Sequence, residues 1–478
     1  MASSLYVKFC LPQFIKYANM IAMSQKHILN TWSIAMINII AIDSLRSPAF
    51  AAKFGNSLVG FYLIATVCFF IPTSLICAEL ASRFPKKGGI YVWIKEALGK
   101  EAAFLIVWIQ WIYNTIWFPS LMMFVWAAMT SIINIPFLKT PLVTLMGMIS
   151  IFWLCTLANC FGMRLSSWIS TASAILGTLI PISIICILAL FRTHWHGLTH
   201  FHLIDFVPNF YEQKDSLPYF VELLFGLIGI EISAAHADEV VNPAKTFPKA
   251  TLISVIIIVL SLILASLAIV AMVPAEELNV IEGVMQTAKL ILDENHLSWF
   301  FPVFGSLVIL GSLGSLAAWV IGITKGVFVA AQDDFLPKFL AKENKYNAPY
   351  VILLIQGIIF SILSISVIIL PIQVAFVLLS AVTTQLSLII YVTLFYAAYL
   401  LKQQRPFHDN YFKTPLLGFV CIIGSITSVI TFFIGFMVPS ELGYSSPASY
   451  SISILCIFVI AMLPPVLGIL SSRKRSAQ

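Results

Sequence analysis

Two long apolar segments of this chain are interrupted near their middle, and they occupy matching places in its two halves. The first runs from about residue 27 to 52 and is broken at residues 43–48, which include Arg46 and Pro48. The second runs from about 218 to 236 and is broken at residues 226–231. A lipid bilayer offers no water to free backbone groups, so such breaks persist only where the opened backbone is buried in protein or lines a cavity.

The composition is that of a chain that crosses a membrane many times. Of the 478 residues, 60% are hydrophobic and only 10% are charged, which is unlike a soluble globular domain. Apolar runs of about 20 residues, enough to cross a hydrocarbon core of about 30 Å, recur throughout. We predict twelve spans, at about 29–52, 57–80, 102–132, 142–161, 168–191, 218–236, 250–273, 298–330, 350–370, 372–401, 415–438 and 448–470.

The distribution of Lys and Arg predicts the orientation. These residues concentrate in segments that share a side with both termini, such as 83–100, 338–345 and 473–475. Positive loops stay inside, so we expect both termini to be cytoplasmic. The net charge of +6 therefore reflects topology and does not indicate nucleic-acid binding. The predicted external loops contain no cysteine and no N-glycosylation acceptor, which favours the inner membrane of a bacterium.

Short connections indicate one transmembrane domain, from 27 to 470, between an N-terminal segment at 1–26 and a short basic tail at 471–478. If the interrupted first and sixth spans are equivalent, the chain contains two five-span repeats, at about 27–192 and 215–401, and two extra spans at 415–470. An odd number of spans inverts the second repeat. Paired interrupted spans of this kind typically form the substrate site of a secondary transporter.

Glu231 is the strongest candidate for chemistry, because a carboxylate at membrane depth is expensive and usually faces a cavity, pairs or carries a proton. We expect it to act as a proton carrier or gate, or to pair with a substrate ammonium. The alternative is a structural carboxyl that satisfies the opened backbone. In the first break, Asp43 and Arg46 are three residues apart, a spacing that allows them to pair across one turn.

Aromatic and amide side chains in other spans are weaker candidates. Trp319 lies in the eighth span and Tyr391 in the tenth, and most such aromatics serve packing. Gln110, Asn114 and Trp117 share one helical face of the third span. This face is a candidate cavity wall, although core packing is the favoured interpretation.

Several stretches together resemble the amino-acid permeases of the amino acid–polyamine–organocation superfamily, and the glutamate/GABA antiporter branch most of all. Residues 229–243 resemble the sixth-span signature of these proteins. Similar stretches lie at 78–81, 87–91, 283–287 and 319–326, and the resemblance extends from about 27 to 470. Ser315, Ser387 and the Ser-Leu-Arg-Ser sequence of the first break depart from the pattern of that branch, so the resemblance indicates amino acids as a class.

The resemblance implies a 5+5 inverted repeat, alternating access, and amino-acid exchange or proton-coupled uptake. Carried over by position, it implies substrate contacts from Ser44, Leu45, Arg46, Ser47, Gly229, Ile230, Glu231, Trp319 and Tyr391. For proton coupling or gating, the candidates are Glu231 and Asp43.

We therefore expect an all-α polytopic membrane protein of twelve helices with a leucine-transporter-like repeat. It would be a secondary transporter, not an enzyme, for small amino acids or their decarboxylated amines. Its partners would be this substrate, the lipid bilayer and protons, with no cofactor, no metal and no nucleic acid; the sequence does not indicate an oligomeric state.

Two alternatives stay open. One is a transporter of polyamines or other organic amines, which would favour several cavity carboxylates, whereas only Glu231 and Asp43 qualify. The other is an integral-membrane, metal-dependent enzyme that uses the histidines of an external loop, at 194, 196, 200 and 202.

Overall fold

The computed structural model describes residues 29–86, 88–160, 173, 175–190, 203–333, 335–346, 348–404, 410–439 and 446–476. These residues form helices and their connections, and the one strand-like pairing among them is an isolated bridge between Leu29 and Val240. The all-α fold class predicted from the sequence is confirmed. The predicted N-terminal segment, 1–26, and the four loop histidines lie outside the described residues.

The helices of the first half, in chain order, are α2 (Thr31–Ile42), α3 (Pro48–Ala52), η1 (Gly55–Ser57), α4 (Leu58–Ala65), η2 (Thr66–Phe70), α5 (Ile71–Arg83), α6 (Ile90–Leu98), α7 (Lys100–Ile133), η3 (Pro136–Lys139), α8 (Pro141–Cys160), η4 (Ile175–Leu179), α10 (Ile180–Leu190) and η5 (Leu203–Phe206). Those of the second half are α11 (Tyr219–Phe225), η6 (Ile230–Glu239), α12 (Pro243–Met272), α13 (Gly283–Glu294), η7 (Ser298–Phe300), α14 (Phe301–Gln332), η8 (Lys338–Ala341), α15 (Tyr350–Ser364), α16 (Ser366–Ile369), α17 (Ile372–Lys402), α18 (Leu417–Ile434) and α19 (Pro447–Ser476).

Within the described residues, 10 helical segments are long and apolar enough to cross a membrane. Two shorter apolar helices, Thr31–Ile42 and Ile175–Ala189, lie where the first and fifth spans are predicted. Each predicted span therefore has a helical counterpart. Two further helices, α6 and α13, lie between predicted spans.

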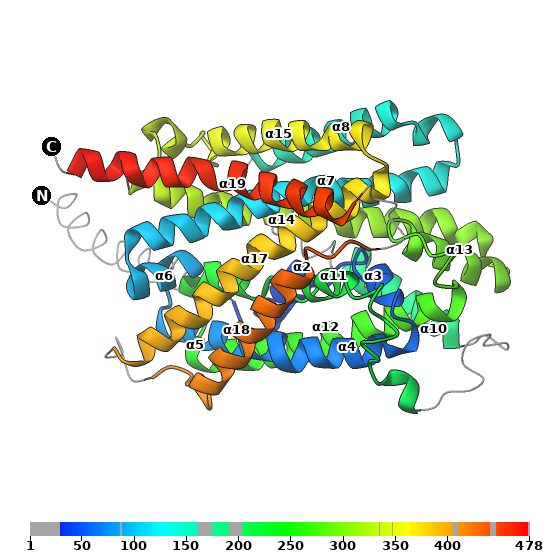
Figure 1. Cartoon of the computed structure of the whole chain (residues 1–478), viewed down its shortest axis with the longest axis horizontal. Coiled ribbons are helices and arrows are strands. Elements are labelled where there is room, and N and C mark those ends of the chain that lie inside the picture. The colour runs from blue at the N-terminus through cyan, green and yellow to red at the C-terminus, as the bar shows by residue number, and fades with distance from the viewer. Residues whose placement is uncertain are drawn as a thin grey trace, which may run out of the picture.

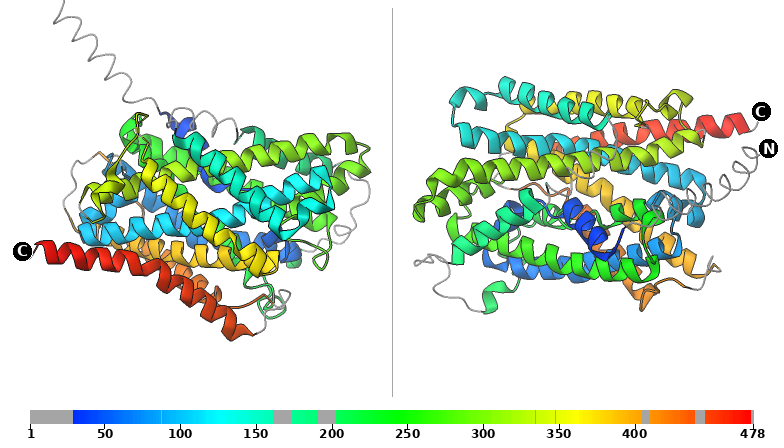
Figure 2. Two further views of the ribbon diagram at one scale, coloured as in Figure 1. Left: turned by 90° about the horizontal axis from the view of Figure 1, so that it is seen from above. Right: turned by 180° about the vertical axis from the view of Figure 1, so that it is seen from behind.

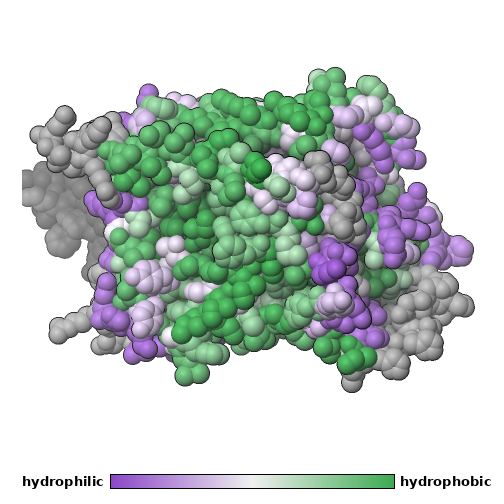
Figure 3. Space-filling view, in the orientation of Figure 1, coloured by the Kyte–Doolittle hydropathy of each residue, from purple (hydrophilic) through white to green (hydrophobic). Residues whose placement is uncertain are grey.

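The helices run along the long axis of the molecule, and its sides are apolar. Figure 1 shows α6 and the end of α19 at one end of the bundle and α13 at the other, and Figure 2 shows the same separation from two further directions. In Figure 3 a broad apolar band lies between polar ends. Leu154 and Val459, each 67% exposed, belong to this lateral surface. Such a band matches the hydrocarbon core of a bilayer, and the chain is a multi-pass membrane protein.

The centre of the bundle is built by long helices that bury most of their surface. In α17, 94% of the most apolar stretch is buried inside the protein. This helix packs against α7 and α18. α7 also packs against α14. In contrast, α8 and α15 pack against each other at one edge of the bundle (Figures 1 and 2). The two interrupted spans lie among the buried helices and not at this edge.

The interrupted first and sixth spans run in opposite directions. The Leu29 N–H donates to the Glu239 carbonyl at 3.0 Å, and the Val241 N–H donates to the Leu29 carbonyl at 3.0 Å. The start of the first span therefore lies beside the end of the sixth. Accordingly, α2 packs against η6, and α3 packs against α11. This antiparallel arrangement is the one that an inverted repeat requires.

The end of the bundle that contains α6 is joined to the end of α14. Lys95 Nζ donates to Asp333 Oδ2 at 2.8 Å, and the Tyr91 hydroxyl donates to the same oxygen. The loop that follows, with exposed Lys342, therefore lies at the α6 end, whereas exposed Lys289 belongs to α13 at the opposite end.

Single cysteines at positions 289 and 342, in a variant without native cysteines, should react with a membrane-impermeant thiol reagent from opposite sides of sealed vesicles. The reason is that the two positions lie at opposite ends of the apolar band. Permeabilised vesicles, in which both cysteines should react, are the control. Labelling of both positions from one side of sealed vesicles would contradict this arrangement.

Candidate functional site

The first span consists of two short helices, because α2 ends at Ile42 and α3 begins at Pro48. Proline lacks the N–H of a continuing helix and disfavours helical backbone at the residue before it. The break leaves the Ala41 carbonyl without a donor from its own helix. The indole Nε1 of Trp319, on α14, donates to this carbonyl at 3.1 Å. A side chain of the eighth span thus satisfies a backbone group that the break sets free.

The sixth span is broken between α11, which ends at Phe225, and η6, which begins at Ile230. Gly229 has a φ of 128°, which other residues rarely adopt. A Cβ at this position would also lie 3.1 Å from Cζ2 of Trp319 and 3.2 Å from Cγ1 of Ile42. The backbone conformation therefore strongly favours glycine here, and the two close contacts add to this preference. The two breaks touch at this point, since Ile42 ends α2.

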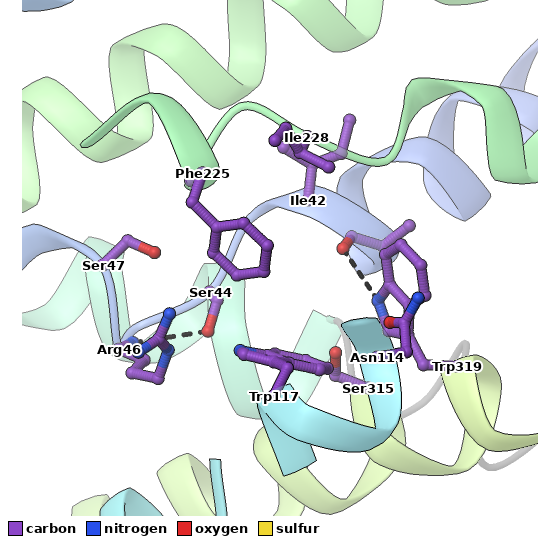
Figure 4. Close-up of a pocket in the computed structure, with 12 residues that line it drawn as sticks. Ile42, Ser44, Arg46, Ser47, Asn114, Trp117, Phe225, Ile228, Ser315 and Trp319 are labelled. Carbon is purple, nitrogen blue, oxygen red and sulfur yellow. Dashed lines mark hydrogen bonds between the residues drawn. The ribbon is translucent and has the colours of Figure 1, made fainter. Parts of the chain in front are cut away.

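A small cavity lies between the two breaks (Figure 4). The first break contributes Ile42, Ser44, Arg46 and Ser47 to its wall, together with the backbone of Ala41. Its hydroxyl groups and opened backbone give this wall a polar character.

The opposite wall is formed by aromatic and small polar side chains. Phe225, Gly226 and Ile228 come from the second break, Asn114 and Trp117 from α7, and Ser315 and Trp319 from α14. The rings of Trp117 and Phe225 lie between Arg46 and Trp319, with 6.0 Å between their centres (Figure 4). Trp117 Nε1 is buried and has no hydrogen-bond partner within the described part of the chain. A buried donor beside a cavity is available to a ligand.

Arg46 is buried and forms an ion pair with a residue of the sixth span. Its Nη2 donates to Glu222 Oε2 at 3.1 Å, and its Nη1 donates to Ser380 Oγ, on α17, at 2.9 Å. Arg46 is 1% exposed and Glu222 is 2% exposed, so neither charge is balanced by water. The pair makes this corner of the cavity neutral overall and fixes α3 to α11.

Three phenylalanine rings enclose the Arg46 guanidinium. Their centres lie 5.2 Å (Phe376), 5.5 Å (Phe50) and 5.6 Å (Phe225) from its central carbon. Cations are attracted to the faces of aromatic rings, most strongly away from water. The rings therefore contribute to holding a charged group at membrane depth.

Glu231 is buried, 4% exposed, and lies beside the cavity without lining it. Its Oε2 accepts a hydrogen bond of 2.7 Å from the Tyr391 hydroxyl. The oxygen of this hydroxyl accepts a hydrogen bond from the Gly229 N–H at 3.2 Å. Tyr391 thus connects the carboxylate to the opened backbone of its own span.

The predicted pair of Asp43 with Arg46 is wrong. Arg46 pairs with Glu222, and Asp43 Oδ2 instead accepts a hydrogen bond of 2.7 Å from Ser261 on α12. The two side chains extend toward different helices, because residues 43–47 are not helical. Helical spacing therefore does not apply between them.

The structure brings all the predicted site residues into one region but gives them different positions. Ser44, Arg46, Ser47 and Trp319 line the cavity. The other predicted residues are buried next to it: Asp43, Leu45, Gly229, Ile230, Glu231 and Tyr391.

Three features of the site were missed or undervalued from the sequence. Asn114 and Trp117 line the cavity, although core packing is the interpretation that their sequence pattern favours. Glu222 was not recognised at all. A signal existed for it, because a buried arginine and a carboxylate, each in an interrupted span, both need a partner of opposite charge.

Comparison with known proteins agrees with this architecture. A family model described as amino acid permease matches residues 29–462. An uncharacterised transporter of Legionella pneumophila is 40% identical over 87% of this chain and 91% of its own length. A glutamate/gamma-aminobutyrate antiporter of Lactococcus lactis is 29% identical over 93% of this chain and 90% of its own length. A probable agmatine/putrescine antiporter of the same species is 24% identical over 80% of each chain.

The match covers almost the whole chain, and the resemblance noted in the sequence is confirmed. The similar proteins are transporters and not enzymes. This chain is therefore a membrane transporter that belongs to the amino acid permease family.

Proposed function

We propose that this protein is a secondary active antiporter for small amino acids, with the substrate bound in the cavity between the two breaks. The observation that carries the proposal is the wall of this cavity. It combines opened backbone, the hydroxyls of Ser44 and Ser47, and the indole N–H of Trp117, which has no partner among the described residues. A substrate carboxylate is the kind of group that such donors recognise. The L. lactis antiporter that handles glutamate and gamma-aminobutyrate supports the same substrate class.

The charges around the cavity favour amino acids over polyamines. Among the residues that line it, Arg46 is charged and none is a carboxylate. A polyamine is positively charged and would be repelled by the Arg46 guanidinium. It would find no free carboxylate to bind, because the nearby Glu222 is paired with Arg46. A zwitterionic amino acid has a carboxylate that can accept from the hydrogen-bond donors of the wall and an ammonium that can donate to backbone carbonyls. Transport of agmatine or putrescine, as named for one relative, is therefore the second candidate.

We assign complementary roles to the predicted residues. Ser44, Ser47 and Trp319 contact the substrate, and Arg46 sets the charge of the wall. The other residues, including Leu45, Gly229, Ile230, Glu231 and Tyr391, shape the wall from behind. In this scheme Glu231 acts as a gating residue, because its hydrogen bond with Tyr391 holds the second break closed.

From the positive-inside bias we infer that the protein lies in an inner membrane and that the α6 end of the bundle faces the cytoplasm. Both chain termini would then be cytoplasmic. Labelling of position 289 from outside the cell, and of position 342 only after permeabilisation, is the outcome that this orientation requires.

Counterflow in proteoliposomes tests the substrate class. Vesicles that contain the purified protein and an internal amino-acid mixture should accumulate labelled small amino acids, offered one at a time, and should not accumulate labelled putrescine or agmatine. Vesicles without protein are the control. Accumulation of the amines alone would support the second candidate, and accumulation of none of the solutes would contradict the proposal.

Glu231→Gln should slow transport and leave substrate binding nearly unchanged. Gln keeps the shape but replaces a charge-assisted hydrogen bond by a neutral one, a loss of about 1 kcal/mol, which corresponds to roughly fivefold in rate. Binding and counterflow should both be measured from pH 5 to 8. Tyr391→Phe, which removes the same hydrogen bond but keeps the carboxylate, should slow transport to a similar extent.

Two outcomes would contradict this role for Glu231. Loss of substrate binding by roughly 1.5–3 kcal/mol would show that the carboxylate pairs directly with the substrate ammonium. Loss of the pH dependence of transport in Glu231→Gln, but not in Tyr391→Phe, would show that Glu231 carries a coupled proton.

A further inference from the structure

Asp43 is a buried carboxylate at the start of the first break. It directly follows α2 and is 2% exposed. Its Oδ2 has one hydrogen-bond donor, Ser261 Oγ, whereas its Oδ1 has no partner within the part of the chain that the structure describes. A carboxylate so deep in a membrane protein needs a positive charge or a proton.

Among the described residues, no basic side chain forms an ion pair with Asp43. The nearest basic residue in sequence, Arg46, is engaged by Glu222, and none of the ion pairs among the described residues includes Asp43. Tyr62 on α4 is an ionisable group near it, and the Tyr62 hydroxyl lies 3.5 Å from Ser266 Oγ. The negative end of the α2 dipole lies at the same position and also disfavours an anion.

The geometry of Ser261 provides independent support for a proton. Its Oγ lies 2.7 Å from Asp43 Oδ2 and 2.9 Å from the Ile258 carbonyl oxygen. The hydroxyl has a single proton, so it cannot fully satisfy both acceptors. When Asp43 carries a proton, its O–H donates to Ser261 Oγ, and the Ser261 O–H donates to Ile258. With protonated Asp43, both hydrogen bonds of Ser261 have a donor. With ionised Asp43, one of the two acceptors has none.

We propose that Asp43 is a proton-binding site and that its proton is the one coupled to transport. Binding adds one proton to the carboxylate, and release returns that proton to water. Ile42 and Ser44, its neighbours in the chain, both line the cavity, so a change in the Asp43–Ser261 contact shifts the wall of the substrate site. The coupling rests on the proposed transport function, whereas the proton binding does not.

A metal cation fits this position less well than a proton. Sodium and other hard cations take several oxygen ligands. The side chains at this position that face each other are Asp43 and Ser261, which provide few such oxygens. Dependence of the site on sodium is accordingly an outcome that would contradict the proposal.

Asp43→Asn tests the proposal, because its amide can donate to Ser261 as the protonated acid does. The melting temperature of the purified wild-type protein should fall as the pH rises from 5 to 8, since the folded state then releases a proton that stabilises it. Asp43→Asn should lose at least half of this fall. Its counterflow should vary less than twofold over the same range. Glu276→Gln, which removes an exposed carboxylate in the loop before α13, is the control that keeps the wild-type pH dependence.

Unchanged pH dependence in Asp43→Asn, or a melting temperature that responds to sodium instead of protons, would overturn the proposal. So would an Asp43→Asn variant that fails to fold while Asp43→Glu folds, because the charge would then be required. A measurement without mutation is modification by dicyclohexylcarbodiimide, which reacts with protonated carboxyl groups in apolar surroundings. Mass spectrometry should find Asp43 modified faster at pH 5 than at pH 8; modification that is absent or equal at both would contradict the proposal.

These measurements separate the two levels of the interpretation. If the wild-type protein exchanges no amino acid, the proposed function fails, but melting and carbodiimide modification still decide whether Asp43 binds a proton. If exchange occurs and Asp43 shows no proton binding, only the coupling site is wrong.

Discussion

The fold depends on hydrogen bonds to the backbone groups that the two interrupted helices leave free, because the bilayer core offers these groups no water. Two of these groups bind side chains from other spans. Trp319 of α14 donates to the Ala41 carbonyl, and the Tyr391 hydroxyl of α17 accepts from the Gly229 N–H. An unsatisfied backbone group in hydrocarbon costs several kcal/mol, so these bonds fix two long helices against the breaks. The cavity is the space that remains between them.

The second constraint is the balance of buried charge. Arg46 and Glu222 neutralise each other, and three aromatic rings and Ser380 complete the surroundings of the guanidinium. Removing one member of such a pair leaves an uncompensated charge, so the pair ties the two half-helices α3 and α11 together. Motions that open this side of the cavity would therefore carry both half-helices together. The cavity itself stays nearly neutral, which suits a zwitterionic solute.

The positions of the two breaks follow from local sequence. Pro48 and Gly229 act through their own backbone, and their effect needs no knowledge of the rest of the chain. Contacts between residues of distant spans cannot be predicted from local sequence in this way. Arg46 and Glu222 are separated by 176 residues, so only the packing of the two breaks shows that they meet.

Helical spacing was misleading in two places for related reasons. It suggested that Asp43 reaches Arg46, although the segment between them is not helical. For Asn114 and Trp117 it correctly placed both residues on one face of α7, but spacing alone does not distinguish a face that lines a cavity from one that packs against a helix. The difference arises only where the second break leaves space opposite that face.

Substrate protection of a cysteine at position 315 is the most direct test of the claim that the cavity between the breaks holds the substrate. Ser315 lines the cavity from α14, and cysteine is close to serine in size. In a variant without other cysteines, a transported amino acid at saturating concentration should slow the reaction of this thiol with a small reagent. A cysteine at position 289 should react at the same rate with and without substrate. Unslowed reaction at position 315, in protein that still exchanges the amino acid, would place the substrate elsewhere.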